Sequence, residues 1–187
     1  MTTTEAKLDY EQFQRIPRYD GRRFELIDGK VFTPPTPNTA HQRTVGKILI
    51  ALDKFVEHQG VGEVFLGPLD VVFNGWTALE PDLLFIRKDR ASIVTDANVA
   101  GAPDLVIEIL SPSNKAYDRK TKLRAYEKAG VPEIWYLDPE DQTAEVLNLG
   151  GDGLYVVTAK LSGDAAIVSK ALPGLFLILG QVFAATP

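Results

Sequence analysis

The stretch "APDLVIEILSPS", residues 102–113, decides the fold of this chain. Between residues 105 and 110 every side chain is aliphatic except that of Glu108. Such a nearly continuous apolar run is typical of a central strand that is covered on both faces. A carboxylate buried there without a partner is costly, and it tends to take up a proton instead. Glu108 therefore needs a cationic partner, a proton or a metal ion.

Around this strand the sequence alternates between β-rich and helical patterns. Residues 24–32 predict a hairpin with an Asp-Gly turn. Apolar residues at helical spacing predict a helix over 38–59, with Asn38 or Thr39 as its N-cap, and a second helix over 117–129. Further strands are expected at residues 62–67, 69–74, 81–88, 133–138, 143–149 and 153–160, and a last strand or short helix at 172–183. The order predicts a mixed α/β (α+β) domain in which helices flank a central mixed sheet.

Length and composition narrow the class of protein. The 187 residues suit one domain, 1–187, and the 45% hydrophobic and 24% charged content is typical of globular proteins. The absence of cysteine excludes disulfides, thiolate metal sites and cysteine nucleophiles. Residues 1–13 do not resemble a secretory signal, and no apolar run approaches the ~20 residues that cross a bilayer, so we expect a cytoplasmic protein without membrane contact.

Acidic residues in the strands are the candidate metal ligands. Asp104 and Glu108 are four positions apart on one strand, or ~13 Å at ~3.3 Å per residue. Oxygen ligands of one metal ion lie only ~2.0–2.6 Å from it, so these two cannot share an ion. If residues 82–87 pair with residues 104–110 at a lateral spacing of about 4.8 Å, Asp82 and Glu108 converge instead. Two carboxylates suit Mg²⁺ or Mn²⁺.

A basic segment follows the Glu108 strand. Between residues 115 and 128, six basic side chains stand against two acidic ones. The basic residues are Lys115, Arg119, Lys120, Lys122, Arg124 and Lys128. The net charge of −5 argues against a protein that coats nucleic acid by bulk electrostatics, yet this local excess could dock a phosphate backbone. A lysine from it could orient a metal-bound water or neutralise charge on a phosphate.

The chain resembles the Uma-type restriction endonuclease family of the PD-(D/E)xK nuclease superfamily. The segments that carry the resemblance are "FELIDGKVF", "HQRTVGKIL", "GEVFLGPLDVVF", "EPDLLFIRKDR", "GAPDLVIEILSPSN", "DRKTKLRAYEKAGVPEIWYLDPE" and "LPGLFL". Together they run from about residue 22 to residue 178. The resemblance implies a restriction-endonuclease-like fold, in which a central mixed sheet flanked by helices carries carboxylates at its catalytic edge.

The resemblance also implies roles for individual residues. Asp82 matches the acid of the PD element, and Glu108 matches the acid of the (D/E)xK element. The lysine of that element is missing, because Leu110 occupies its position. Members of the family supply the lysine from the following helix, where Lys122 is the candidate and Lys120 competes with it. Glu25 matches another acidic position, as a further metal ligand or a neighbour of the site.

These observations predict a DNA endonuclease that hydrolyses phosphodiester bonds with Mg²⁺ or Mn²⁺ held by Asp82 and Glu108. The resemblance implies double-stranded DNA as the substrate and a homodimer as the assembly. The alternative is a nuclease-derived module that binds nucleic acid or regulates without catalysis, which Leu110 and the acidic net charge favour.

Structural interpretations stay open beside the catalytic ones. Glu108 could be a buried acid paired with an arginine, and Asp82 could cap a turn. Lys122 could be a solvated surface lysine, and Glu25 could simply flank the hairpin. His41 stands close to the start of the first helix, from which it could approach the site or a phosphate, although we expect a surface role.

Overall fold

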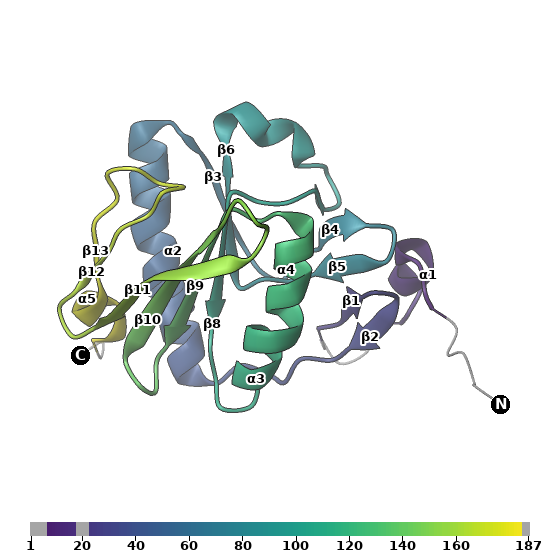
Figure 1. The fold of residues 1–187 in the computed structure, drawn as a ribbon, viewed down its shortest axis with the longest axis horizontal. Coiled ribbons are helices and arrows are strands. Elements are labelled where there is room, and N and C mark those ends of the chain that lie inside the picture. Colours follow the sequence, from purple (N-terminus) through teal and green to yellow (C-terminus); the bar gives the residue numbers. More distant parts are fainter. Residues whose placement is uncertain (1–6, 18–22, 185–187) are drawn as a thin grey trace.

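The computed structural model describes residues 7–17 and 23–184, so the expectation for the first six residues lies outside it. Its largest element is a six-stranded mixed sheet with β8 (Leu105–Ile109) near the centre (Figure 1). The strands across this sheet are β11 (Tyr155–Ser162), β10 (Thr143–Leu149), β9 (Glu133–Asp138), β8, β6 (Leu83–Arg87) and β3 (Gly62–Leu66). β8 runs antiparallel to β6 and parallel to β9, so the predicted mixed sheet around this strand is confirmed.

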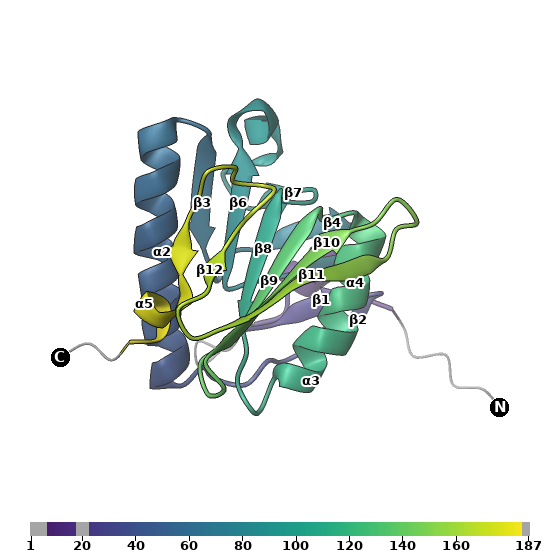
Figure 2. The same cartoon turned by 60° about the vertical axis from the view of Figure 1, so that its left-hand side comes forward.

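One face of the six-stranded sheet packs against the long helix α2 (Thr39–Gln59) and the short helix α5 (Leu179–Phe183), as Figure 2 shows. Ile48 and Leu52 of α2 are fully buried against this face, together with Ile107 of β8. The Asn38 side chain caps the helix, which ends at Gly60 in the left-handed conformation. Of the two predicted caps, Asn38 is therefore the one used.

The other face packs against a helical segment and a second sheet. The helical segment consists of α3 (Lys115–Tyr117), the π-helix η3 (Asp118–Lys122) and α4 (Leu123–Ala129), and it connects the parallel strands β8 and β9. The second sheet contains, in order, β2 (Lys30–Phe32), β1 (Glu25–Ile27), β5 (Thr77–Leu79), β4 (Val71–Asn74) and β7 (Val99–Ala100). A buried apolar cluster joins this sheet and α4 to β8.

The structure departs from the predicted elements in two ways. The strands are divided among three sheets, the smallest being the pair β12 (Ala166–Ile167) and β13 (Leu177–Ile178). The helix expected over 117–129 starts at residue 115 and contains a π turn, in which the amide of Leu123 donates to the carbonyl of Asp118. The sequence pattern did not predict two short helices and three short strands, which are α1 (Tyr10–Gln14), the 3₁₀ helix η2 (Lys88–Ile93), β5, β7 and β12. Among the described residues, no helix is both long and apolar enough to cross a membrane.

Candidate functional site

Asp82 and Glu108 lie side by side on the sheet face that α4 covers. The register of β6 and β8 pairs Leu83 with Ile107, so Asp82, one residue before β6, comes next to Glu108. Side chains alternate along a strand, and the two acids fall on the same face because both are one step removed from that pair. The amide of Ile109 donates a 2.9 Å hydrogen bond to Asp82 Oδ2, which ties the two strands together at this point. The predicted strand pairing is confirmed.

The partner of Glu108 is Lys122, which reaches it from the π turn. Lys122 Nζ lies 2.5 Å from Glu108 Oε1 and 3.1 Å from Glu25 Oε1, and all three side chains are buried. The hydroxyl of Tyr126 also donates to Glu108, and that of Tyr117 donates to Glu25 Oε2 at 2.7 Å. Glu25, in β1, thereby joins the second sheet to the cluster. Glu108 is thus paired with a lysine rather than an arginine.

Lys120 does not share this position. It lies two residues before Lys122, on the exposed side of the helical segment, and lines a different hollow. The position that holds the lysine of the (D/E)xK element carries Leu110, which is buried in the cluster that contains Tyr126. An apolar side chain fits this cluster, and the ammonium group of Lys122 reaches Glu108 from the helical segment instead.

Asp82 is held by three donors. Oδ1 accepts a 3.1 Å bond from Arg23, and Oδ2 lies 3.0 Å from Nε2 of His41 and accepts from the Ile109 amide. Burial acts to raise the pKa of Asp82, but His41, Lys122 and the amide outweigh it, and the pKa lies below its ordinary value. Asp82 is therefore a stable anion at neutral pH.

The expectation of a surface role for His41 is wrong. Its side chain is only 3% exposed because the first turn of α2 points at the edge of the sheet where Asp82 lies. Nδ1 of His41 is buried and has no hydrogen-bond partner within residues 7–17 and 23–184. Nothing in the local sequence around residue 41 indicates this long-range contact.

Asp118 is a further buried acid of the site that the sequence reasoning missed. It lies one helical turn before Lys122, with Oδ1 3.9 Å from Nζ. Burial raises the pKa of Asp118 to about 7, an effect that Lys122 opposes and Glu25 increases. Its spacing of four residues from Lys122, which puts the two on one helix face, was the available signal.

Glu108 is the second acid whose charge depends on its surroundings. Burial raises the pKa of Glu108 well above its ordinary value, Lys122 opposes the rise, and Asp118, Asp82 and Glu25 add to it. Lys122 keeps its charge: burial alone would lower its pKa, but Glu108 and Glu25 hold the pKa well above the usual value. A single ammonium group thus balances several carboxylates.

These side chains enclose a cavity of about 20 Å³. A volume of roughly 10–15 Å³ already holds one water molecule, so the cavity accepts a small ion or water. Its walls are the acids Glu25, Glu80, Asp82, Glu108 and Asp118, the polar side chains Arg23, His41, Asn114 and Lys122, and the prolines 34, 35 and 37. Glu80 was also missed, although it lies two residues before Asp82 in "EPD".

The donor set of this cavity fits a hard divalent cation. Within residues 7–17 and 23–184, no three His, Asp or Glu side chains form a ready metal site, and Lys122 holds Glu25 and Glu108 instead. Mg²⁺, however, is usually bound by one or two carboxylates together with water and substrate phosphates. Asp82 and Glu108 provide such a pair, and a bound cation would favour the ionised form of Glu108.

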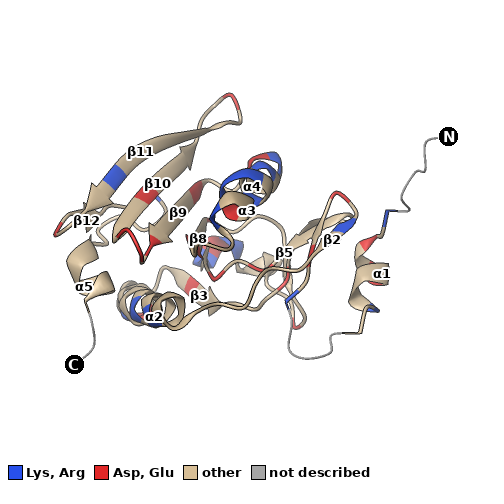
Figure 3. Cartoon of the chain, turned by 90° about the horizontal axis from the view of Figure 1, so that it is seen from below, with Lys and Arg blue, Asp and Glu red and all other residues tan. Residues whose placement is uncertain are grey.

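The other predicted residues lie apart from the cavity or are neutralised. Asp104 is at the opposite end of β8, where it accepts from Arg90 and the Arg87 amide. Of the basic segment, three residues form ion pairs with acids elsewhere: Lys115 with Asp138 and Asp141, Arg119 with Glu145, and Lys128 with Asp28. Figure 3 shows the Lys and Arg positions along α4 in blue. Lys120 and Arg124 remain exposed.

Comparisons with known proteins agree with the predicted family and fold. Residues 10–180 match the family model described as "Uma2: Putative restriction endonuclease". The chain is also similar to a solved structure from Anabaena variabilis, described as a putative nuclease belonging to DUF820. The two chains share 24% sequence identity and a TM-score of 0.78, with 94% of this chain and 97% of the other covered. No curated protein matches the chain.

The structural likeness confirms the fold class, a mixed α/β arrangement of the restriction-endonuclease-like type. The family match spans most of the sequence and confirms the resemblance that the motifs indicated. It supports a nuclease function in general terms, without specifying the metal or the substrate. The chain therefore belongs to the Uma2 family.

Proposed function

We propose that this protein is a divalent-metal-dependent DNA endonuclease, with Asp82 and Glu108 as metal ligands and Lys122 as the lysine of the site. One observation carries the proposal. Two acids on neighbouring strands and a buried lysine face one ion-sized cavity, with Lys122 Nζ 2.5 Å from Glu108 Oε1. This set combines hard oxygen donors for a cation with a positive charge for a phosphate, which phosphodiester hydrolysis requires.

Each residue has a distinct part in the proposed chemistry. Mg²⁺ or Mn²⁺ bound by Asp82 and Glu108 would polarise a phosphoryl oxygen and lower the pKa of a bound water. Lys122 would turn its ammonium group from the carboxylates towards the charge of the scissile phosphate, or position the attacking water. Glu25 is an accessory acid that holds Lys122 at 3.1 Å before substrate enters.

The residues around this set act by positioning. His41 and Arg23 orient the Asp82 carboxylate through separate oxygens, and the hydroxyls of Tyr117 and Tyr126 orient Glu25 and Glu108. A carboxylate fixed in this way loses little side-chain entropy when a cation binds, because its orientation is already set.

The direct test is nicking of supercoiled plasmid DNA with Mg²⁺ or Mn²⁺ and with EDTA. We expect cleavage by the native protein only with a divalent cation, and a loss of at least 100-fold in Asp82→Asn, Glu108→Gln and Lys122→Met, in line with removal of a transition-state contact. Glu63→Gln, an exposed acid of β3, and Lys54→Met, an exposed lysine of α2, are the matched controls and should cleave normally. Undiminished cleavage by Asp82→Asn and Glu108→Gln would refute the proposed site.

The second candidate is a nuclease-derived module that binds nucleic acid or regulates without cutting it. The observation in its favour is the ion pairing of Lys122 with Glu108 and Glu25, a self-contained arrangement without any metal. Titration calorimetry with Mn²⁺ separates the two. Binding that disappears in Glu108→Gln favours the nuclease, whereas no binding from pH 6 to pH 9 favours the module.

We further propose that the active assembly is a homodimer acting on double-stranded DNA, since two strands are cut by two sites. Light scattering on the purified protein gives its mass in solution. A mass of twice 20.5 kDa is expected, and a strictly monomeric protein that linearises plasmid in one encounter would contradict this arrangement.

A further inference from the structure

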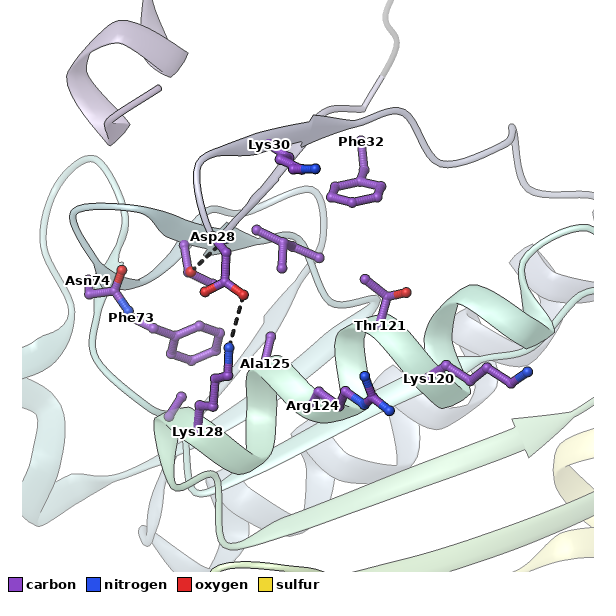
Figure 4. Close-up of a pocket in the computed structure, with 13 residues that line it drawn as sticks. Asp28, Lys30, Phe32, Phe73, Asn74, Lys120, Thr121, Arg124, Ala125 and Lys128 are labelled. Carbon is purple, nitrogen blue, oxygen red and sulfur yellow. Dashed lines mark hydrogen bonds and ion pairs between the residues drawn. The ribbon is translucent and has the colours of Figure 1, made fainter. Parts of the chain in front are cut away.

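A hollow of about 480 Å³ lies next to the proposed site, between the β1–β2 hairpin and α4. We call it the hairpin groove. Lys30 and Phe32 line it from the hairpin, Phe73 and Asn74 from β4, and six residues from the helical segment (Figure 4). Those six are Lys120, Thr121, Arg124, Ala125, Lys128 and Ala129. No part of this groove is used by the chemistry proposed above.

The hairpin groove concentrates positive charge in an acidic protein. Lys120, Arg124 and Lys128 follow one another at intervals of four residues, so they occupy one side of the helical segment over ~12 Å at ~1.5 Å per residue. Lys128 is bound to Asp28 at 2.9 Å, which closes one end of the groove (Figure 4). Lys120 and Arg124 are exposed and form no ion pair with any described residue. Their charge is available to an anion, while the chain as a whole carries −5.

Two phenyl rings, those of Phe32 and Phe73, also line the groove. The Phe32 ring lies 5.4 Å from that of Tyr117, and the Phe73 ring meets that of Tyr126 edge-on at 5.9 Å. Each phenylalanine is therefore supported by a tyrosine of the helical segment and remains only partly buried. Rings held rigidly beside exposed cations are the combination on which unpaired bases stack while their phosphates are bound.

The same tyrosines connect the groove to the catalytic cavity. Tyr117, which supports Phe32, donates to Glu25, and Tyr126, which supports Phe73, donates to Glu108. Along the chain, Phe32 lines the groove and Pro34, two residues later, lines the cavity. A strand that lies in the groove thus runs towards Asp82 and Glu108.

We propose that the hairpin groove binds an unpaired DNA strand and leads it to the site, so that the enzyme prefers double-stranded DNA in which one strand is unpaired beside the scissile bond. This rests on the proposed nuclease function and specifies its substrate. A duplex offers phosphates to Lys120 and Arg124 but keeps its base faces stacked, so Phe32 and Phe73 would be unused. An unpaired strand uses both the cations and the rings.

The test is fluorescence anisotropy with a labelled 12-nucleotide strand and with the blunt duplex of the same sequence, in EDTA. We expect the single strand to bind at least tenfold more tightly than the duplex. The double variant Lys120→Glu/Arg124→Glu should weaken single-strand binding by at least tenfold and flatten its salt dependence. Lys54→Glu, which reverses one charge on the exposed side of α2 where the groove variant reverses two, is the control and should have at most a small effect.

A second variant tests the rings without changing charge. Phe32→Leu keeps an apolar side chain against Tyr117 but removes the aromatic surface, and it should weaken single-strand binding about tenfold with little effect on duplex. Equal affinity for both DNAs, or an equal loss for both in Phe32→Leu, would overturn the proposal. So would a loss in Lys54→Glu as large as that in the groove variant. Because binding is measured without metal, a protein that binds single strands but never cuts would refute the nuclease and leave the groove standing.

Discussion

Glu108 is tolerated inside a central strand because the protein surrounds it with one cation and two hydroxyl-bearing rings. Lys122 lies 2.5 Å away, and Tyr126 donates directly to the carboxylate. Tyr136, on the neighbouring position of β9, fixes the backbone of Asp118 through a 2.9 Å bond to its carbonyl oxygen. The strand thus remains rigid while one charged group faces the cavity. The negative charge of Glu108 therefore depends on the ammonium group of Lys122.

Replacing Lys122 by methionine is expected to lower the free energy of unfolding by about 3–5 kcal/mol, because Glu108 and Glu25 would be left buried without a cation. Urea denaturation of the purified variant measures this. Lys120→Met removes an exposed lysine two positions away and should change stability by less than about 0.5 kcal/mol. Mn²⁺ should restore part of the stability of Lys122→Met by replacing the lost charge. A variant as stable as the native protein would show that Lys122 is not the counter-ion of these acids.

Asp118 predicts a specific dependence of stability on pH. Its pKa is raised from its ordinary value of 3.8 to about 7, so between these values the folded protein binds more protons than the unfolded chain. Stability linked to this group is therefore present at low pH and is lost as the pH rises towards 7. Between pH 4.5 and pH 7.5 the native protein should lose about 3 kcal/mol more of its free energy of unfolding than Asp118→Asn does.

Urea unfolding at several pH values, in EDTA, checks the Asp118 prediction. The exposed acid Asp53, on α2, provides the control variant Asp53→Asn, whose pH profile should match that of the native protein. Parallel profiles for Asp118→Asn and the native protein would mean that Asp118 is ionised at all these pH values.

At the scale of elements, the site is made where strand ends, a helix start and a π turn meet. β6 and β8 supply Asp82 and Glu108, the first turn of α2 supplies His41, and η3 supplies Lys122. π turns inside helices are rare and often occur at functional sites. Here the turn contains both Asp118 and Lys122, whose side chains are buried.

The start of α2 can be tested through its cap. Asn38 Oδ1 accepts a 2.9 Å bond from the His41 amide, so Asn38→Ala should lower the free energy of unfolding by about 1 kcal/mol. Because the same turn carries the His41 ring to Asp82, plasmid cleavage should fall as well. Thr39→Ala is the control: Thr39 is exposed and does not cap the helix, so stability should change by less than about 0.5 kcal/mol. A larger loss in Thr39→Ala than in Asn38→Ala would contradict the observed cap.

Much of this arrangement could be predicted from sequence where local patterns determine it. The two-residue period of strands and the apolar run around Glu108 sufficed to predict the pairing that brings Asp82 beside it. The helical spacing of the apolar residues in α2 and the end of this helix at Gly60 could be predicted equally well. Only the family resemblance favoured Lys122 over Lys120. Both are lysines on the same helix, and the sequence pattern alone does not show which of the two side chains faces the site.

Other features depend on contacts between layers and left no local pattern. The burial of His41 requires α2 to begin at one edge of the sheet, and residue 41 alone does not indicate that. The division of the strands into separate sheets follows from packing of the second sheet on the first, which short strands such as β5 do not reveal. The apolar residues of this segment have the spacing of an ordinary α-helix, so the sequence pattern did not predict the π turn.

At the scale of the whole molecule, two sheets and the helical segment gather five buried acids around one small cavity and leave a basic groove beside it. The six-stranded sheet supplies Asp82 and Glu108, the five-stranded sheet supplies Glu25, and the helical segment between them supplies the lysine. The acidic net charge thus coexists with a local surface suited to a polyanion. Metal binding is the property on which the proposed function of this arrangement depends.

The most direct measurement is therefore anomalous diffraction from crystals of the protein soaked in Mn²⁺. We predict a peak in the cavity within ~2.0–2.6 Å of carboxylate oxygens of both Asp82 and Glu108, the distance range of oxygen ligands to such ions. In the same crystals, Lys122 should be the nearest lysine, displaced from Glu108. An unoccupied cavity at saturating Mn²⁺, with Lys122 still bound to Glu108, would contradict the central claim that these acids form a metal centre.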